Sequence, residues 1–175
     1  MVVIVLNRLI LGMNFHIKLT SLALVLVGLI ACKDDDQSSN VPFIKFLNTN
    51  KKIMKQGDLN QDSLWLSFSF EDGDGDLGFG SSSGNQDIFL IDKRTDQLQD
   101  AFKIPDLPDA GGKPISGNAS ILIFTTCCLF PNNIPPCSNP VQFPNDSLRY
   151  ELYIKDRAGH ESNHVISDWI VLSCQ

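Results

Sequence analysis

Alternation between apolar and polar residues is the feature that most constrains the fold of this chain. Residues 63–70 and 149–155 switch between the two kinds at nearly every step, which is the period of a strand with one buried and one solvated face. The side chains expected on the buried faces are Leu64, Leu66, Phe68, Phe70, Tyr150, Leu152 and Ile154. No stretch after residue 42 carries a long helical period, so this part of the chain is predicted to be all-β.

Five further segments have strand-like composition, and clusters of Gly, Pro, Asn, Asp and Ser between them predict turns. These segments are residues 43–47, 88–92, 99–104, 120–126 and 164–172. About seven strands with irregular turns predict one antiparallel β-sandwich domain over residues 42–175.

The segment before the last predicted strand, residues 154–163 (IKDRAGHESN), resembles the penultimate hairpin of immunoglobulin-like bacterial surface domains. In those domains a turn of the Asp-x-Ala-Gly-Asn-x-Ser kind joins the two final strands, and here His160 stands where Asn is commoner. The resemblance implies that the sandwich is immunoglobulin-like.

An apolar run precedes the domain. Residues 19–31 (LTSLALVLVGLIA) follow Lys18 in the order of a secretory signal, and the run is shorter than the roughly 20 apolar residues of a membrane-spanning helix. We therefore expect residues 1–31 to be a helical signal peptide that is removed. Met13 is the expected true start, because residues 1–12 would place a second apolar stretch ahead of the charged region.

The run closes with Leu29-Ile30-Ala31-Cys32, which resembles the lipobox of bacterial lipoproteins. The resemblance implies cleavage before Cys32 and acylation of its thiol and new amino terminus, for example with palmitate. Several acyl chains together anchor a protein stably to a membrane. The Cys-Lys-Asp-Asp pattern at this point resembles the export signal of surface lipoproteins in Bacteroidota, which implies attachment to the outer membrane and display on its surface.

Residues 32–41 are too polar to fold and are predicted to form a flexible acidic tether. The whole chain carries 14 basic and 20 acidic residues, and removal of residues 1–31 would take away only Arg8 and Lys18 among the charged ones. The mature chain is therefore more acidic still, which excludes the basic surface that nucleic-acid binding needs.

Four cysteines follow Cys32, namely Cys127, Cys128, Cys137 and Cys174. An even number in an exported protein predicts two disulfides. Neighbouring cysteines seldom bond to each other, so one of Cys127 and Cys128 is expected to pair with Cys137 and the other with Cys174. A four-thiolate zinc site is the alternative, although the C-x-x-C pairs of structural zinc sites are missing.

The largest cluster of acidic residues lies in residues 71–78 (EDGDGDLG), directly after the most regular predicted strand. Asp72, Asp74 and Asp76 have the spacing of the first three ligands of calcium loops, and Ca²⁺ accepts six to eight such oxygens. The pattern departs from the EF-hand loop because Leu77 replaces its Gly and Ser83 its final Glu. Remaining ligands would come from Asp87, backbone carbonyls or other loops. The alternative is a solvated acidic turn without metal.

Residues 80–84 (GSSSG) match the G-x-S-x-G elbow of serine hydrolases, with Asp156 and His160 or His164 following in the right chain order. The elbow belongs to a turn from strand into helix, whereas Ser82 is followed by a predicted strand, so a solvated loop is expected. His160 and His164 could form a zinc pair only if they met in space.

We therefore expect a non-catalytic binding or accessory module, held to a membrane through Cys32, with a structural Ca²⁺ and an unidentified protein or glycan ligand. Trp65, Tyr153 and Trp169 are candidates for a glycan-stacking platform. The competing expectation is a small hydrolase that uses Ser82.

Overall fold

The structure is a computed structural model of the chain, and it describes residues 1–6, 39–80, 82–105, 107–108 and 110–175. The lipobox, Cys32 and most of the predicted tether lie outside the described residues. The part of the chain that is described contains strands and turns but no helix, so no candidate for a membrane-crossing helix is found there.

Eleven strands make up the described fold. They are β1 (Val2–Leu6), β2 (Phe43–Thr49), β3 (Ile53–Lys55), β4 (Ser63–Asp72), β5 (Ile88–Asp92), β6 (Gln97–Phe102), β7 (Ile115–Phe124), β8 (Asn145–Leu148), β9 (Tyr150–Ile154), β10 (Val165–Ile166) and β11 (Ile170–Ser173).

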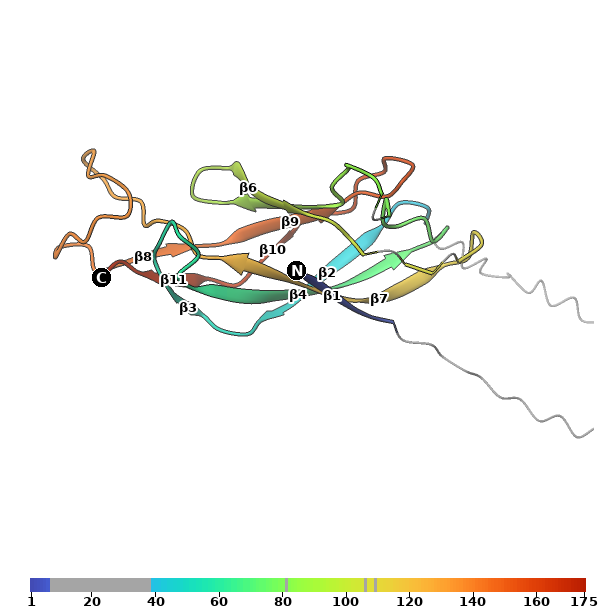
Figure 1. Cartoon of the computed structure of the whole chain (residues 1–175), viewed down its shortest axis with the longest axis horizontal. Helices are drawn as coiled ribbons and strands as arrows, with labels where there is room; N and C mark the ends of the chain where they lie inside the picture. Colours follow the sequence, from blue (N-terminus) through green and yellow to red (C-terminus); the bar gives the residue numbers. More distant parts are fainter. Residues whose placement is uncertain (7–38, 81, 106, 109) are drawn as a thin grey trace, which may run out of the picture.

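The strands form three sheets, ordered β1-β7-β4-β2, β10-β9-β5-β6 and β3-β11-β8. The first two sheets lie over each other as two layers, with β4 and β7 in one and β6 and β9 in the other (Figure 1). All pairings are antiparallel except that of β3 with β11, which is parallel. The predicted all-β class and sandwich architecture are confirmed.

The core lies between the two layers, and the alternation of the sequence places it there. The even-numbered residues of β4 from Leu64 to Phe70 are at most 3% exposed, and β5 and β9 bury every second residue in the same way. All seven side chains that the alternation assigns to buried faces belong to the core. Burial of apolar surface between the layers is the main favourable term that holds them together.

Most predicted strands are present, with corrected bounds. The strand predicted from residue 120 begins at Ile115, because the segment pairs with β4 along its whole length. The strand predicted over residues 164–172 is two strands, β10 and β11, separated by a break at Ser167, whose hydroxyl accepts the N–H of Tyr150. Strands β3 and β8 were not predicted. The helix predicted for residues 1–31 is wrong for residues 2–6, which form β1 by pairing with β7, and the rest of that segment lies outside the described residues.

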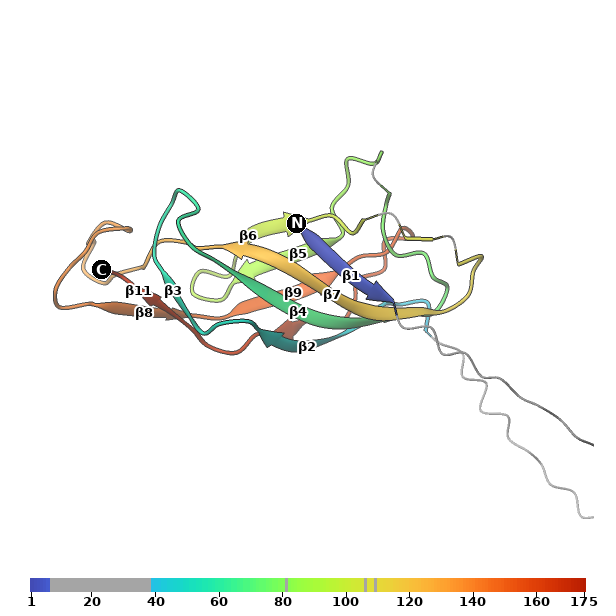
Figure 2. The same cartoon turned by 60° about the horizontal axis from the view of Figure 1, so that its bottom comes forward.

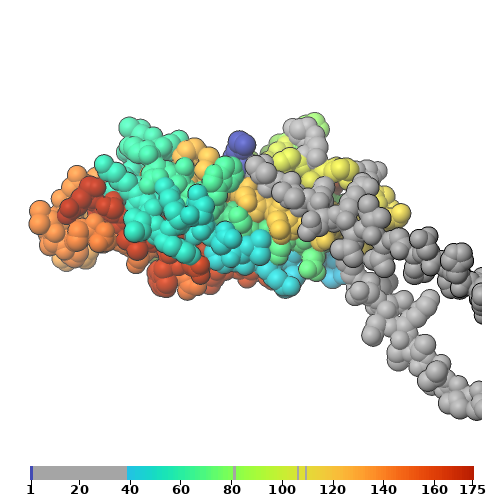
Figure 3. Space-filling view, turned by 90° about the horizontal axis from the view of Figure 1, so that it is seen from below, coloured from blue at the N-terminus to red at the C-terminus, as the bar shows by residue number. Residues whose placement is uncertain are grey.

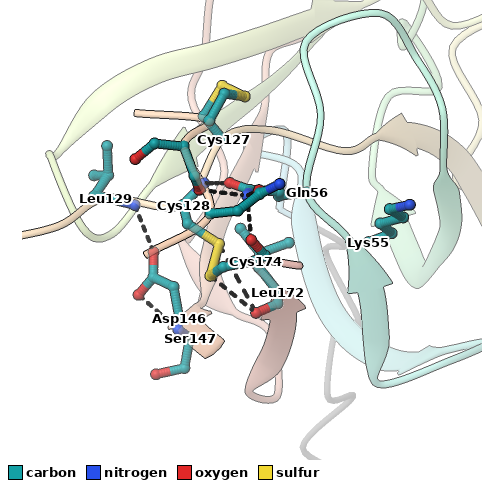
Figure 4. The surroundings of a disulfide bond; sticks show 12 residues. Lys55, Gln56, Cys127, Cys128, Leu129, Asp146, Ser147, Leu172 and Cys174 are labelled. Carbon is teal, nitrogen blue, oxygen red and sulfur yellow. Dashed lines mark hydrogen bonds between the residues drawn. A yellow bond between two sulfur atoms is a disulfide. The ribbon is translucent and has the colours of Figure 1, made fainter. Parts of the chain in front are cut away.

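One end of the sandwich is closed by two disulfides, Cys127–Cys137 and Cys128–Cys174, which confirms the predicted pattern and assigns its partners. The buried side chain of Gln56 joins these segments: its amide nitrogen donates to the carbonyl of Cys174, and its oxygen accepts the N–H of Cys128 (Figure 4). We call this region, comprising Gln56, residues 127–137 and Cys174, the cystine end.

The molecule is elongated along the strands. The C-terminus and β8 lie at the cystine end, and the turn after β4 lies at the opposite end (Figure 2). The surface view shows residues near 130–145 as a knob at one tip of the molecule (Figure 3). The two ends of the sandwich are therefore far apart and carry different chemistry.

Candidate metal centre

The acidic loop begins where β4 ends, at Asp72, and the chain then turns back on itself. Gly75 and Gly78 have φ of 69° and 83°, a region that side chains rarely adopt. A Cβ on Gly75 would lie 2.3 Å from the carbonyl oxygen of Lys113, so only glycine fits there. The tight turn brings the N–H of Leu77 to Oδ2 of Asp72, at 3.2 Å.

A second segment reaches the same place from the other sheet. The turn after β9 pairs Asp156 with Leu77 in an isolated antiparallel bridge. As a result Asp72, Asp76 and Asp156 each offer one carboxylate oxygen within 4.8 Å of the others. Asp72 and Asp156 are 1% and 0% exposed, so two of these carboxylates are fully buried. We call residues 72–78 and 156–160 the acidic end.

The hydrogen bonds at the acidic end leave several oxygens unused. Asp76 Oδ2 accepts the N–H of Ala158 at 3.1 Å, and both oxygens of Asp156 contact His160, through its N–H and its Nδ1, each at 2.8 Å. Oδ1 of Asp72, of Asp74 and of Asp76 is buried and has no hydrogen-bond partner. Buried acceptors are nearly always satisfied, so three orphan carboxylate oxygens in one loop need an explanation.

The electrostatics of the cluster oppose ionisation. Burial, together with the nearby negative charges of Asp74 and Asp76, raises the pKa of Asp72 to about 6. Burial also raises the pKa of Asp76, with added repulsion from Asp156 and Asp74. The guanidinium of Arg157 donates to the carbonyls of Gly78 (2.6 Å) and Leu77 (3.3 Å), and its charge only partly offsets the rise in the pKa of Asp76.

The donor set at the acidic end suits a hard cation. The three orphan atoms of this loop are carboxylate oxygens, the ligand type that Ca²⁺ binds, and a divalent ion would neutralise the repulsion that raises these pKa values. Three carboxylates fall short of the six to eight oxygens of a Ca²⁺ shell, so backbone carbonyls and water would complete it. His160 is turned toward Asp156 through Nδ1, which leaves the cluster an all-oxygen site.

The structure places the four predicted ligands differently from one another. Asp72 and Asp76 belong to the cluster, and Asp74 adjoins it and raises the pKa of both. Asp87 is not one of the three clustered carboxylates, because its oxygens accept the N–H groups of Phe79 (3.3 Å) and Ile104 (2.8 Å). Asp87 therefore stabilises the backbone that follows the acidic loop, at residues 79 and 104.

Asp156 is the cluster member that sequence reasoning assigned to another role. It lies 80 positions after Asp76, and only the fold brings the two together. The available signal was its position at the start of the turn after an alternating strand, where a carboxylate would lie at the end of a sheet.

The proposed hydrolase residues are only partly assembled. His160 and Asp156 are hydrogen-bonded, as a triad would require, but the structure has no hydrogen bond within its described residues between Ser82 and either histidine. Ser82 is exposed in a turn between β4 and β5, and the following segment leads into a strand. The strand-to-helix context of the nucleophile elbow is therefore missing around Ser82.

The two histidines do not share a site. His164 contacts Glu151 through Nδ1 (2.6 Å) and Glu161 through Nε2 (2.9 Å), whereas His160 contacts Asp156. The ring of His164 stacks on Tyr153, with centroids 4.6 Å apart.

The aromatic candidates are also separated, since Trp65 lies on β4 and Tyr153 on β9, in different sheets. Trp169 is 60% exposed, and the guanidinium of Arg149 lies over its ring. Trp65 and Tyr153 therefore do not form one stacking surface.

Comparison with known proteins gives no family for this chain: no family model matches it, and the searches of curated proteins and of solved structures found no match.

Proposed function

We propose that the chain is a lipid-anchored lipoprotein of the bacterial outer membrane, whose β-sandwich is a non-catalytic binding or accessory module stabilised by Ca²⁺. The observation that carries the metal proposal is Oδ1 of Asp72, a buried carboxylate oxygen without a partner, in a cluster with Asp76 and Asp156. The anchor is supported by the lipobox-like Leu29-Ile30-Ala31-Cys32 and by the polar residues after it.

The bound ion would join segments that are distant in the sequence. Asp72 ends β4, Asp76 belongs to the loop after it, and Asp156 belongs to the turn after β9 in the other sheet. A cation between them would hold the two layers together at an end that has no disulfide among its described residues. The role proposed for Ca²⁺ is therefore structural.

Calcium binding is tested with purified residues 39–175. Calorimetric titration with Ca²⁺ should show one site and a rise in thermal midpoint, since a ligand that binds only the native state adds about 2.7 kcal/mol at 100 times its dissociation constant. Asp72→Asn should abolish both signals. Asp58→Asn, the same change at an exposed aspartate outside the cluster, is the matched control. Absence of heat and of any thermal shift at millimolar Ca²⁺ would dispose of the metal site.

The anchor is tested on native protein extracted from membranes. Intact-mass analysis should find a chain that begins at Cys32 and carries acyl chains, and Cys32→Ser should release the protein from the membrane fraction. Protease treatment of intact cells, with a periplasmic protein as control, then tests display on the outer surface. A native mass that includes residues 1–31, or an unmodified Cys32, would overturn the proposal.

A small serine hydrolase is the second candidate, favoured by the 2.8 Å contact between His160 Nδ1 and Asp156 Oδ2. Hydrolysis of short-chain esters that is lost in Ser82→Ala and in His160→Gln, but kept in Ser83→Ala, would establish it. Equal activity in all variants and the parent would reject it.

A further inference from the structure

The first sheet ends in a strand that the proposed processing would remove. The backbone of β1 runs antiparallel to β7, in a register from Val2 opposite Ile121 to Leu6 opposite Gly117. The N–H of Leu122 donates to the carbonyl of Met1 at 3.2 Å. When residues 1–31 are cleaved away, β7 becomes the edge strand of that sheet.

The other edges of the two main sheets carry features that block pairing with a further strand. β2 presents Lys45 and has an irregularity in its ladder between Phe46 and Asn48. β6 carries Asp100, and its ladder with β5 is interrupted between Leu90 and Ile91. β10 is only two residues long. Charges, bulges and short length are the means by which natural sheets protect their edges.

Strand β7 has none of these features. Its ten residues, ISGNASILIF, contain no charge and no proline, and its ladder with β4 runs without a register shift from Phe124 to Ile115. Since Leu122 donates its N–H away from β4, the alternation of an antiparallel ladder also directs the N–H groups of Ser116, Asn118 and Ser120 outward. A long, regular and uncharged edge of this kind pairs readily with another strand.

We propose that in the processed protein β7 pairs antiparallel with β7 of a second copy, which joins two three-stranded sheets into one continuous sheet. The inference relies on the proposed removal of residues 1–31. A two-fold axis presents the same edge to itself, so one uncharged strand serves both partners without repulsion between like charges. The register of β1 shows that this edge accepts an antiparallel partner along at least five residues.

The test uses residues 39–175, which lack β1 and contain the buried core from Ile44 to Cys174 together with both disulfides. Sedimentation velocity from about 1 to about 200 µM should show a reversible dimer, in the range expected for a modest interface. Two variants block the edge by different means: Asn118→Pro removes an outward N–H, and Leu122→Lys adds a charge. Each should weaken association at least about tenfold.

Gln99→Lys, which places the same charge on the exposed β6 edge, is the control and should leave the dimer unchanged. Circular dichroism and thermal melts establish that each variant is folded. Because Leu122→Lys keeps the backbone donor, it decides the outcome if Asn118→Pro fails to fold. Slow amide exchange at Ser120 in the dimer and fast exchange in the Leu122→Lys variant would confirm the paired edge.

Three outcomes would overturn the proposal. A monomer at the highest concentration leaves the edge unpaired. A dimer that resists both β7 variants lies at another surface. A monomer that binds a peptide of residues 1–6, with the same sensitivity to Leu122→Lys, assigns the edge to a strand from another source. The sample already lacks residues 1–31, so failure here is distinct from failure of the processing itself, which intact mass reports.

Discussion

The two ends of the sandwich both join segments that are distant in the sequence, but they do so with different chemistry. At the cystine end, Cys128–Cys174 and the side chain of Gln56 join segments from across the chain, and the amide of Gln56 is fully used. At the acidic end, Asp72, Asp76 and Asp156 also join segments that are distant in the sequence, yet buried oxygens stay without partners.

The two ends therefore differ in how far their stability depends on pH and on cation concentration. Covalent bonds and amide hydrogen bonds hold the cystine end in the oxidised chain whatever the pH or cation concentration. Carboxylates that repel one another make the acidic end sensitive to both, because protons and cations are the species that relieve the repulsion. Four measurements test this difference between the two ends, and they are given in order of decreasing expected effect.

The largest effect is expected from the long-range disulfide. Replacing Cys128 and Cys174 by Ala should lower the free energy of unfolding by about 4 kcal/mol, because the bond closes a loop with a sequence separation of 46. Replacing Cys127 and Cys137, with a separation of 10, should cost about 3 kcal/mol. Urea unfolding measures both. A larger loss from the shorter loop would contradict the loop-length argument.

The next effect concerns the buried ion pairs beside the cystine end. Arg94 contacts Asp92 at 2.5 Å and Asp146 at 2.6 Å, and it donates to the carbonyl of Cys127. Arg94→Met should cost about 3 kcal/mol in chemical unfolding, since it leaves the buried Asp92 charged and unpaired. Lys52→Met, which removes an exposed ion pair with Asp168, should cost less than about 1 kcal/mol. Equal losses would show that burial does not matter here.

The acidic end should make the metal-free protein less stable as the pH rises. The pKa of Asp72 is about 6 in the folded chain and 3.8 as the ordinary value, so between these values the folded state holds more protons than the unfolded state. The free energy of unfolding should therefore fall by roughly 2 to 3 kcal/mol from pH 4 to pH 7.

Thermal and urea unfolding in the presence of a chelator measure this slope. Asp72→Asn should flatten it, and saturating Ca²⁺ should reverse it by holding the carboxylates ionised. The difference between the parent and Asp72→Asn separates the effect of Asp72 from that of the other carboxylates. If, after this subtraction, the free energy of unfolding is flat or rises from pH 4 to pH 7, the raised pKa assigned to Asp72 is wrong.

The smallest effect is expected from His164. Its hydrogen bonds to Glu151 and Glu161 raise its pKa above 6.5, so its stabilising contribution is complete below pH 6.5 and is lost as the pH rises through the folded pKa. His164→Gln should cost less than about 1 kcal/mol at pH 6, because the pair is partly exposed, and the cost should shrink as the pH rises through the folded pKa. This window lies above that of Asp72, so unfolding at closely spaced pH values separates the two groups.

The core could be predicted from sequence because its strands alternate on their own. Strands β3 and β8 could not, since three and four residues are too short for a period, and Asn145, Asp146 and Ser147 resemble a turn. Both are strands because each pairs with β11. The start of β7 was missed for a related reason: Gly117 and Asn118 favour turns, and pairing with β4 overrides that preference.

The candidate site was predicted in part for the same physical reason. Asp72 and Asp76 are close in sequence and share a loop, so spacing alone indicates that they can converge. Asp156 joins them through a bridge with Leu77 between two sheets. Asp87 was an expected ligand because of its charge and proximity, but its backbone hydrogen bonds depend on the fold of residues 79 and 104.

The N–H of Gly73 in the acidic loop donates to the carbonyl of Ser39 at 3.0 Å, so the chain enters the domain beside the acidic end. In a chain acylated at Cys32, residues 33–38 alone separate the lipid from Ser39, and a segment of that length reaches at most about 25 Å. The acidic end would then lie nearer the bilayer than the cystine end does, and an anionic membrane surface concentrates divalent cations most strongly within about 8 Å of it. If divalent cations were removed from the membrane surface, the acidic end would lose the ion that joins its two segments. The two disulfides would still hold the cystine end.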